Sequence, residues 1–102
     1  MTEYLLGSVD EFAEGKGRAF KVGTRLVAVF RVGQSFHAVA NRCVHKGANM
    51  CDGEVTPDGT KVRCPWHNWP FDLATGRNTI DPEERLRTYE VELDGNDVIL
   101  RV

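Results

Sequence analysis

The chain has 102 residues, which is enough for one small domain with a modest core. Its formal charge of −2, with both signs interspersed, argues against a nucleic-acid-binding protein. It opens without the basic and apolar regions of a signal peptide, and no apolar stretch is long enough to span a membrane, so we expect a cytoplasmic protein. In a reducing compartment its three cysteines are better suited to binding metal than to forming disulfides.

Short β-like runs alternate with turn residues along the whole chain, without a linker or a repeat. Turn signals that recur about every ten residues are typical of a small all-β sandwich or barrel. The spacing of residues 8–11 fits a capping box, which leaves one helical turn and a plain polar loop as alternatives. The strands that we expect lie at residues 4–6, 19–22, 26–30, 35–40, 61–63, 86–93 and 98–102.

Two of these runs carry further information about their surroundings. Leu26 to Phe30 is apolar at every position, which predicts a strand covered on both faces. In residues 35–40 the alternation of side chains along a strand predicts that Phe36 points inward and His37 outward. His37 then has two interpretations, a surface histidine or a proton relay.

Metal-binding residue types gather in two short segments, and each segment follows a predicted strand. The first reads Cys43-Val44-His45, and the second, 18 residues later, reads Cys64-Pro65-Trp66-His67. Asp58-Gly59 predicts a hairpin tip between them, so that the strand at residues 61–63 delivers Cys64. Two loops that each start from a strand can close on one inorganic site.

Two thiolates and two imidazoles can hold zinc, a mononuclear iron or a [2Fe–2S] cluster with two histidines on one iron. Structural zinc sites usually pair Cys with Cys and His with His in each knuckle. Here each segment carries one cysteine and one histidine. A two-iron cluster explains this mixture, because each loop then contributes one ligand to each iron.

The two segments resemble the binding motif of Rieske [2Fe–2S] proteins, and the resemblance covers nearly the whole chain. It extends through His45-Lys46-Gly47-Ala48, residues 71–76 (Phe-Asp-Leu-Ala-Thr-Gly) and Asp81-Pro82. It implies a Rieske fold: a small antiparallel β-sandwich or barrel over residues 1–102, with a two-loop cluster-binding portion at about residues 41–84. It further implies one cluster, with Cys43 and Cys64 on the inner iron and His45 and His67 on the solvent-facing iron.

Four positions around the ligands point to a low reduction potential within the family range of about −150 to +300 mV. High-potential members join an extra cysteine of each loop in a disulfide, and the matching positions here are Ala48 and Trp66. Such members also carry a serine and a tyrosine that donate hydrogen bonds to sulfur, at positions that match Trp69 and Phe71. Fewer donors stabilise the added electron less.

The resemblance implies an electron carrier rather than an enzyme. A Rieske oxygenase needs a second iron held by two histidines and a carboxylate, and after His45 and His67 only His37 remains. We therefore expect a low-potential Rieske-type ferredoxin of a multicomponent oxygenase system. It would take electrons from an NAD(P)H-dependent flavoprotein reductase and pass them to a terminal, ring-hydroxylating oxygenase. Both partners would dock transiently at the His45/His67 tip, without nucleic acid or membrane.

Two alternatives remain open at this point. The chain could be the small Rieske subunit of a larger oxidoreductase, such as an assimilatory NAD(P)H nitrite reductase, or a zinc-binding structural module. Some residues near the motif also have two interpretations: Cys51 as a redox-active thiol or a half-buried packing residue, and Trp66 and Trp69 as a docking surface or a water shield.

Overall fold

The computed structural model describes residues 2–42, 48–66, 68–81 and 83–102. Nearly all regular structure in these ranges is β, with two single 3₁₀ turns, and the all-β expectation is confirmed. The elements in chain order are β1 (Glu3–Ser8), η1 (Val9–Glu11), β2 (Gly17–Val22), β3 (Arg25–Val32), β4 (Ser35–Ala40), η2 (Met50–Asp52), β5 (Glu54–Val55), β6 (Lys61–Arg63), β7 (Pro70–Asp72), β8 (Thr88–Asp94) and β9 (Asp97–Arg101).

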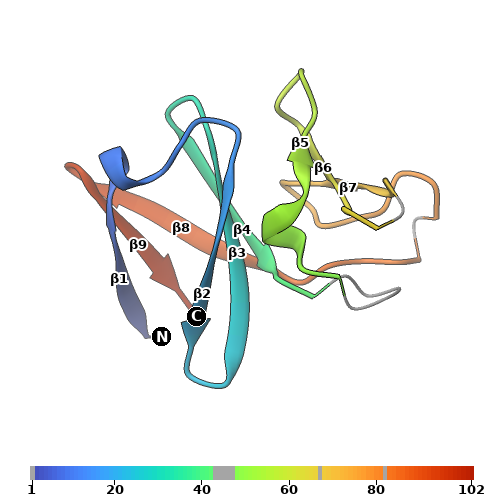
Figure 1. The fold of residues 1–102 in the computed structure, drawn as a ribbon. Coiled ribbons are helices and arrows are strands. Elements are labelled where there is room, and N and C mark those ends of the chain that lie inside the picture. The colour runs from blue at the N-terminus through green and yellow to red at the C-terminus, as the bar shows by residue number, and fades with distance from the viewer. Residues whose placement is uncertain (1, 43–47, 67, 82) are drawn as a thin grey trace.

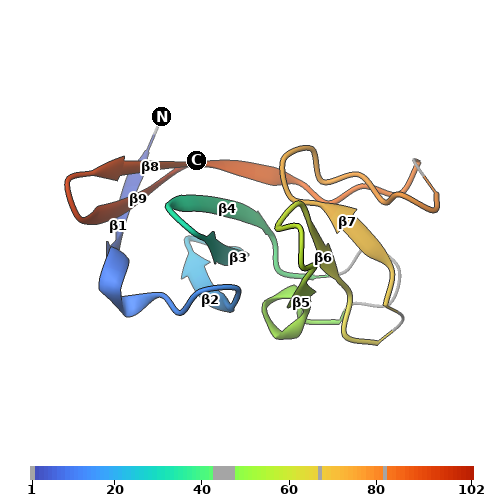
Figure 2. The same ribbon diagram turned by 90° about the horizontal axis from the view of Figure 1, so that it is seen from above.

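The strands form two antiparallel sheets that lie beside each other (Figure 1). The larger sheet has the order β1-β9-β8-β4-β3-β2 and curls round its own core when seen from above (Figure 2). The smaller sheet has the order β5-β6-β7 and includes the predicted hairpin around Asp58-Gly59. The chain between β4 and β8, residues 41–87, is thus an insertion that carries the small sheet and both predicted ligand segments.

β3 is the strand that joins the two halves of the core. Val27 and Val29 pack into the cluster inside the curled sheet, whereas Ala28 and Phe30 pack toward the small sheet. All four are fully buried, which confirms that this run is covered on both faces. Leu26, at the start of the run, is the exception, because its side chain is 46% exposed.

β4 also has both faces covered in part. Phe36 packs in the core of the larger sheet, as alternation predicts. His37 is half-buried rather than on an open surface, and loss of solvation lowers its pKa while the nearby Asp72 carboxylate acts in the opposite direction. The insertion that follows β4 therefore shields a position that the local pattern assigns to solvent.

The turn after β7 requires a glycine at position 76. Gly76 has φ +78°, and its N–H donates to the Asp72 carbonyl oxygen over 2.7 Å. A Cβ atom on this residue would overlap the carbonyl oxygen of Leu86 and lie 3.1 Å from Thr88 Cγ2. This contact fixes the distance between the insertion and the segment that leads into β8.

We expect Gly76→Ala to lower the free energy of unfolding by roughly 2–4 kcal/mol, because left-handed strain and overlap with backbone add together. Gly95→Ala is the matched control: Gly95 has φ +60° but nothing within 4 Å of the new Cβ. Its cost is about 1–2 kcal/mol from strain alone. Urea unfolding of both variants measures the difference, and equal losses would contradict the overlap.

The tip of the β5–β6 hairpin is held by one carboxylate. Asp58 Oδ1 accepts hydrogen bonds from Thr56 Oγ1 at 2.5 Å, from Thr60 N at 3.1 Å and from Thr60 Oγ1 at 2.9 Å. These donors, the Thr56 hydroxyl first, lower the pKa of Asp58 from 3.8 to about 2. They favour the ionised form, because each donates toward the negative charge.

Because the folded pKa lies below the ordinary value, the tip is stabilised above pH 3.8 and loses that stabilisation as the pH falls toward 2. We expect an NMR titration of the Asp58 carboxyl carbon to give a midpoint near 2. The Thr56→Val variant removes the first donor and should move that midpoint upward. A wild-type midpoint at or above 3.8 would contradict the hydrogen-bonded tip.

Candidate metal centre

The second ligand segment is a short loop with its two ends hydrogen-bonded to each other. It begins at Cys64, directly after β6, and the Cys64 side chain is fully buried. The Cys64 N–H donates to the Trp69 carbonyl oxygen over 2.9 Å, and the Asn68 N–H donates to the Cys64 carbonyl oxygen over 2.8 Å. Asn68 has φ +57°, a left-handed conformation that asparagine tolerates better than most residues.

The residues on either side of the first ligand segment are also hydrogen-bonded to each other. Arg42 and Asn49 form an isolated antiparallel bridge, and the Met50 N–H donates to the Asn41 carbonyl oxygen over 2.5 Å. The Asn41 side chain is almost fully buried, where its Oδ1 accepts from Cys51 N at 3.0 Å and its Nδ2 donates to Asn49 Oδ1 at 3.3 Å. Asn41 therefore fixes where the loop opens and closes.

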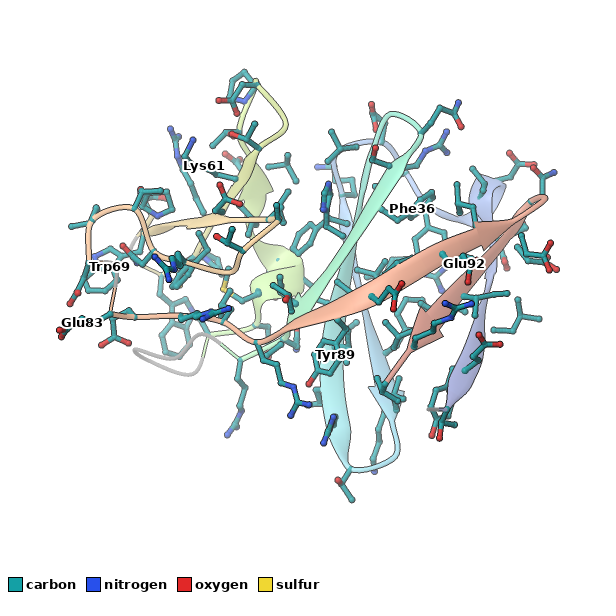
Figure 3. The ribbon with its side chains drawn as sticks, turned by 180° about the vertical axis from the view of Figure 1, so that it is seen from behind. Phe36, Lys61, Trp69, Glu83, Tyr89 and Glu92 are labelled. Atoms are coloured by element: carbon teal, nitrogen blue, oxygen red, sulfur yellow. The ribbon has the colours of Figure 1, made fainter. Side chains whose placement is uncertain are left out.

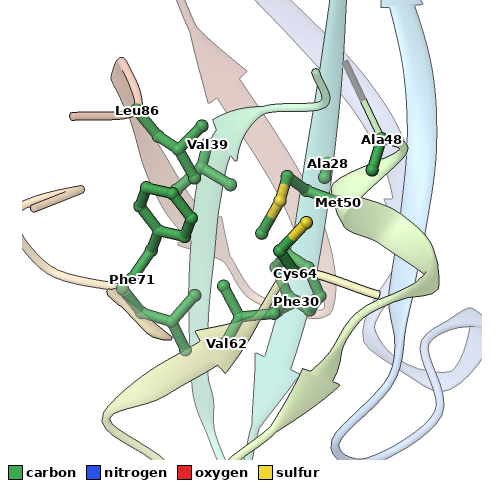
Figure 4. Close-up of a cluster of buried hydrophobic side chains, with 10 residues drawn as sticks. Ala28, Phe30, Val39, Ala48, Met50, Val62, Cys64, Phe71 and Leu86 are labelled. Carbon is green, nitrogen blue, oxygen red and sulfur yellow. The ribbon is translucent and has the colours of Figure 1, made fainter. Parts of the chain in front are cut away.

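The bases of the two loops meet in one buried cluster. Ala48 and Met50, from the return of the first loop, share this cluster with Cys64, and all three are fully buried. Figure 4 shows Cys64 beside Met50 and Phe30. Of the four predicted ligands, only Cys64 lies within the described residues; Cys43, His45 and His67 lie outside them.

A third loop, between Asn78 and Glu84, packs against β7. The Asn78 side chain is 1% exposed, and its Oδ1 accepts hydrogen bonds from Ile80 N at 2.7 Å and Asp81 N at 2.9 Å. Its Nδ2 has no hydrogen-bond partner among the residues that the structure describes. The loop is tied to β7 by the Thr79 N–H, which donates to the Pro70 carbonyl oxygen over 3.0 Å.

No motif in the sequence singles out Asn41 or Asn78. Their only signal is position: each is an amide residue next to a predicted loop that lies near the ligand segments. An asparagine in such a place is usually read as a surface turn residue. Burial, which the sequence does not reveal, turns both into anchors for the loops.

The tryptophans that flank His67 in the sequence have different environments. Trp69 is half-buried and packs against the cluster that contains Cys64, which fits the prediction of a water shield. Trp66 is 65% exposed, and Ile80 in the third loop is 66% exposed. Large apolar side chains this exposed are candidates for contact with another protein.

Cys51 has the environment of a packing residue. It is half-buried against the cluster that contains Cys64, and its N–H is held by Asn41. Burial, and then the negative charge of Asp52, raise the pKa of its thiol. A protonated thiol is a weak nucleophile, so the packing interpretation is the better supported one.

The residues present fit an iron–sulfur cluster. Cys64 is the only predicted ligand that the structure places, and its side chain is buried among apolar side chains where the bases of the two loops meet. In the described ranges no group of three or more His, Cys, Asp or Glu could hold a different metal ion. Burial of a thiolate is unfavourable unless a cation compensates its charge.

Comparison with known proteins agrees with this chemistry. The Rieske [2Fe-2S] domain family matches residues 2–90. The 3-phenylpropionate/cinnamic acid dioxygenase ferredoxin subunit of Escherichia coli (strain K12) is 37% identical over 87 residues, which cover 83% of this chain and 81% of that protein. The chain therefore belongs to the Rieske [2Fe–2S] family, and the prediction of a ferredoxin-type electron carrier with one Rieske cluster is confirmed.

Solved structures extend the similarity to the fold. The ferredoxin of carbazole 1,9a-dioxygenase from Nocardioides aromaticivorans IC177 has a TM-score of 0.90 and 30% identity, over 98% of this chain and 97% of that chain. A ferredoxin in a complex with the reduced oxygenase of carbazole 1,9a-dioxygenase has a TM-score of 0.85 and 28% identity, over 96% of this chain and all of that chain. A putative NADH-dependent nitrite reductase small subunit from Mycobacterium tuberculosis has a TM-score of 0.91 and 26% identity, over 99% of this chain and 96% of that chain.

The described ranges contain no helix of the length and apolarity needed to cross a bilayer.

Proposed function

We propose that Cys43, His45, Cys64 and His67 hold the [2Fe–2S] cluster of this chain, with the cysteines on the inner iron and the histidines on the outer one. The cluster-binding portion spans about residues 41–84 of a single domain over residues 1–102. The observation that carries this proposal is the burial of Cys64 where the bases of the two loops meet. It supports a cysteine end that faces the protein core.

When bound, the cluster supplies storage for one electron. The chain's own residues provide the surroundings for it. Trp69 and the buried apolar side chains around Cys64 exclude water from the cysteine side of the site. Asn41 holds the backbone at Cys51, and Asn78 holds the backbone at Ile80 and Asp81, which limits rearrangement of these residues when the charge changes.

The carrier is proposed to receive electrons from an NAD(P)H-dependent flavoprotein reductase and to deliver them to a terminal ring-hydroxylating oxygenase. A similar ferredoxin occurs in a complex with its oxygenase, which supports this assignment. Docking is proposed at the His45/His67 tip, and the exposed side chains of Trp66, which precedes His67 in the sequence, and Ile80 offer apolar surface for contact with a partner. A small interface suits a transient redox encounter.

The cytoplasm is the proposed location, because a thiol such as Cys51 persists under reducing conditions.

A second candidate is the small subunit of a nitrite reductase, because the Mycobacterium tuberculosis protein has a fold as similar as those of the ferredoxins. The two candidates differ in how long the docked state lasts. Co-purification of the native protein with its partners, followed by size-exclusion chromatography, separates them. Fast electron transfer to an oxygenase without co-elution supports the ferredoxin, whereas stoichiometric co-elution with a large reductase supports the subunit.

A further inference from the structure

Four arginines from three segments of the chain lie near one another at the edge of β8: Arg25 and Arg42 line a depression with Tyr89, and Arg85 and Arg87 line a second one in the segment that leads into β8. We call this surface the arginine face; it consists of Arg25, Arg42, Arg85, Arg87 and Tyr89. Arg25, Arg42 and Tyr89 line one shallow depression of about 380 Å³. The Arg87 guanidinium lies over the Tyr89 ring, 5.3 Å from its centroid.

The local structure explains why these side chains point outward together. Leu86 is fully buried, so the residues on either side of it, Arg85 and Arg87, face solvent in the extended segment that leads into β8. The Ala40 N–H donates to the Arg87 carbonyl oxygen over 2.8 Å, which brings the end of β4 beside this segment. Arg42 lies two residues after Ala40 and lines the same depression.

The arginine face carries charge without local compensation. All four arginines are exposed, and in the described ranges none has a carboxylate within 4.0 Å. Arg101 shows the contrast, because it contacts Glu3, Glu90 and Glu92. Since the chain has a formal charge of −2, the residues outside the arginine face carry −6. The charge distribution is therefore strongly asymmetric.

The face adjoins the base of the cluster loops. Arg42 forms the bridge with Asn49 that closes the first loop, and Arg85 forms a bridge with Arg77 beside the third loop. A molecule that sits on this face is thus held next to the segments that carry the ligands. The acidic residues Asp81, Glu83 and Glu84 of the third loop limit the positive field on that edge.

We infer that the arginine face steers an acidic redox protein toward the cluster loops by docking its carboxylate-rich surface. This inference rests on the proposed function and adds the chemistry of the partner. Arginines around a half-exposed tyrosine are enriched where proteins bind proteins. The residues outside the arginine face are net negative and repel extended polyanions such as nucleic acid and anionic membranes. A compact acidic protein can still approach in the one orientation that meets the arginine face.

The test uses the holo protein and two small redox probes of opposite charge. The dithionite-reduced protein gives one electron to ferricyanide, which becomes ferrocyanide, or to hexaamminecobalt(III), which becomes cobalt(II). Stopped-flow rates are measured at low and high ionic strength. We expect the ferricyanide rate to fall roughly threefold or more as salt is added, and the cobalt rate to rise, because salt screens a positive field near the cluster.

The charge-reversal variant is Arg85→Glu/Arg87→Glu, and the matched control is Lys16→Glu/Lys61→Glu. Both change the formal charge by the same amount, but Lys61 lies on β6, apart from Tyr89 (Figure 3). We expect the arginine variant to slow the ferricyanide rate about fivefold at low salt and to reverse its salt dependence, with a much smaller effect in the control. Equal effects of both variants, or a wild-type ferricyanide rate that rises with salt, would overturn the inference.

Two further measurements exclude other occupants. Holo protein is sedimented with phosphatidylglycerol vesicles and titrated against a DNA duplex at 0.1 M salt. Binding that the arginine variant loses would assign the face to lipid or nucleic acid and overturn the inference; absence of binding supports the protein partner. The EPR signal of the reduced holo protein reports the cluster separately, so a failure of steering is distinguishable from a failure of the proposed function.

Discussion

Cys64→Ser is expected to abolish the iron–sulfur cluster, whereas Cys51→Ser is expected to retain it. The two variants make the same chemical change at cysteines of one buried region, since Cys64 is in the cluster of buried residues and Cys51 packs against it. Of these two cysteines only Cys64 belongs to the ligand motif, and its replacement by serine removes a thiolate bond to iron. We expect iron content to fall to about a tenth or less in Cys64→Ser.

Visible absorption and the EPR spectrum of the reduced protein read out this difference, together with iron and sulfide analysis. Cys43→Ser, His45→Ala and His67→Ala should behave like Cys64→Ser. Retention of a normal cluster in Cys64→Ser would refute the ligand assignment. Loss of the cluster in Cys51→Ser would show that Cys51 takes part in binding, contrary to its environment as a packing residue.

The wild-type midpoint potential is expected below zero, in the lower part of the range of about −150 to +300 mV that Rieske centres span. The physical reason is the lack of hydroxyl donors where high-potential relatives carry them. Phe71 is fully buried in the same apolar cluster as Cys64, and its ring lies by Val39 and Leu86 (Figure 4). A phenylalanine there gives no hydrogen bond to stabilise the added negative charge.

Phe71→Tyr should therefore raise the midpoint potential. A hydrogen bond to a charged group is worth about 1.5 kcal/mol, which corresponds to roughly 60 mV for a one-electron couple. Phe36→Tyr is the matched control, because Phe36 packs edge-on against Phe12 in the other core cluster, 5.3 Å between ring centroids. Spectroelectrochemical titration of the three proteins gives the values. A wild-type midpoint above zero, or equal shifts in both variants, would contradict the explanation.

The ligand motif was accessible to sequence analysis because its information is local. Residue type and spacing alone indicate two loops with one cysteine and one histidine each, and the family match agrees with that chemistry. Strand prediction succeeded for the same reason where a run was long, as at residues 35–40, which correspond to β4. β7 was not predicted, since Pro70 opens it and only three residues pair.

Other features depend on contacts between segments that are distant in the chain. The alternation of β4 puts His37 on the face opposite Phe36, but only the insertion after β4 makes that face half-buried. Asn41 and Asn78 have ordinary turn sequences and become buried anchors only when the loops pack. The requirement for Gly76 comes from the Leu86 carbonyl, ten residues later.

The arginine face is the clearest case of this dependence. Its four cations lie at positions 25, 42, 85 and 87, and the sequence around them shows charges of both signs without a basic run. Pairing of β4 with β8 and the turn between β2 and β3 bring Arg25, Arg42 and Arg87 to Tyr89, while Arg85 lies two residues before Arg87 in the same extended segment. The ligand set could be predicted from neighbouring residues, and stays a prediction, because two short loops are enough to supply four bonds to iron. The electrostatic field around the arginine face could not be predicted from the sequence, because it sums charges over the folded surface.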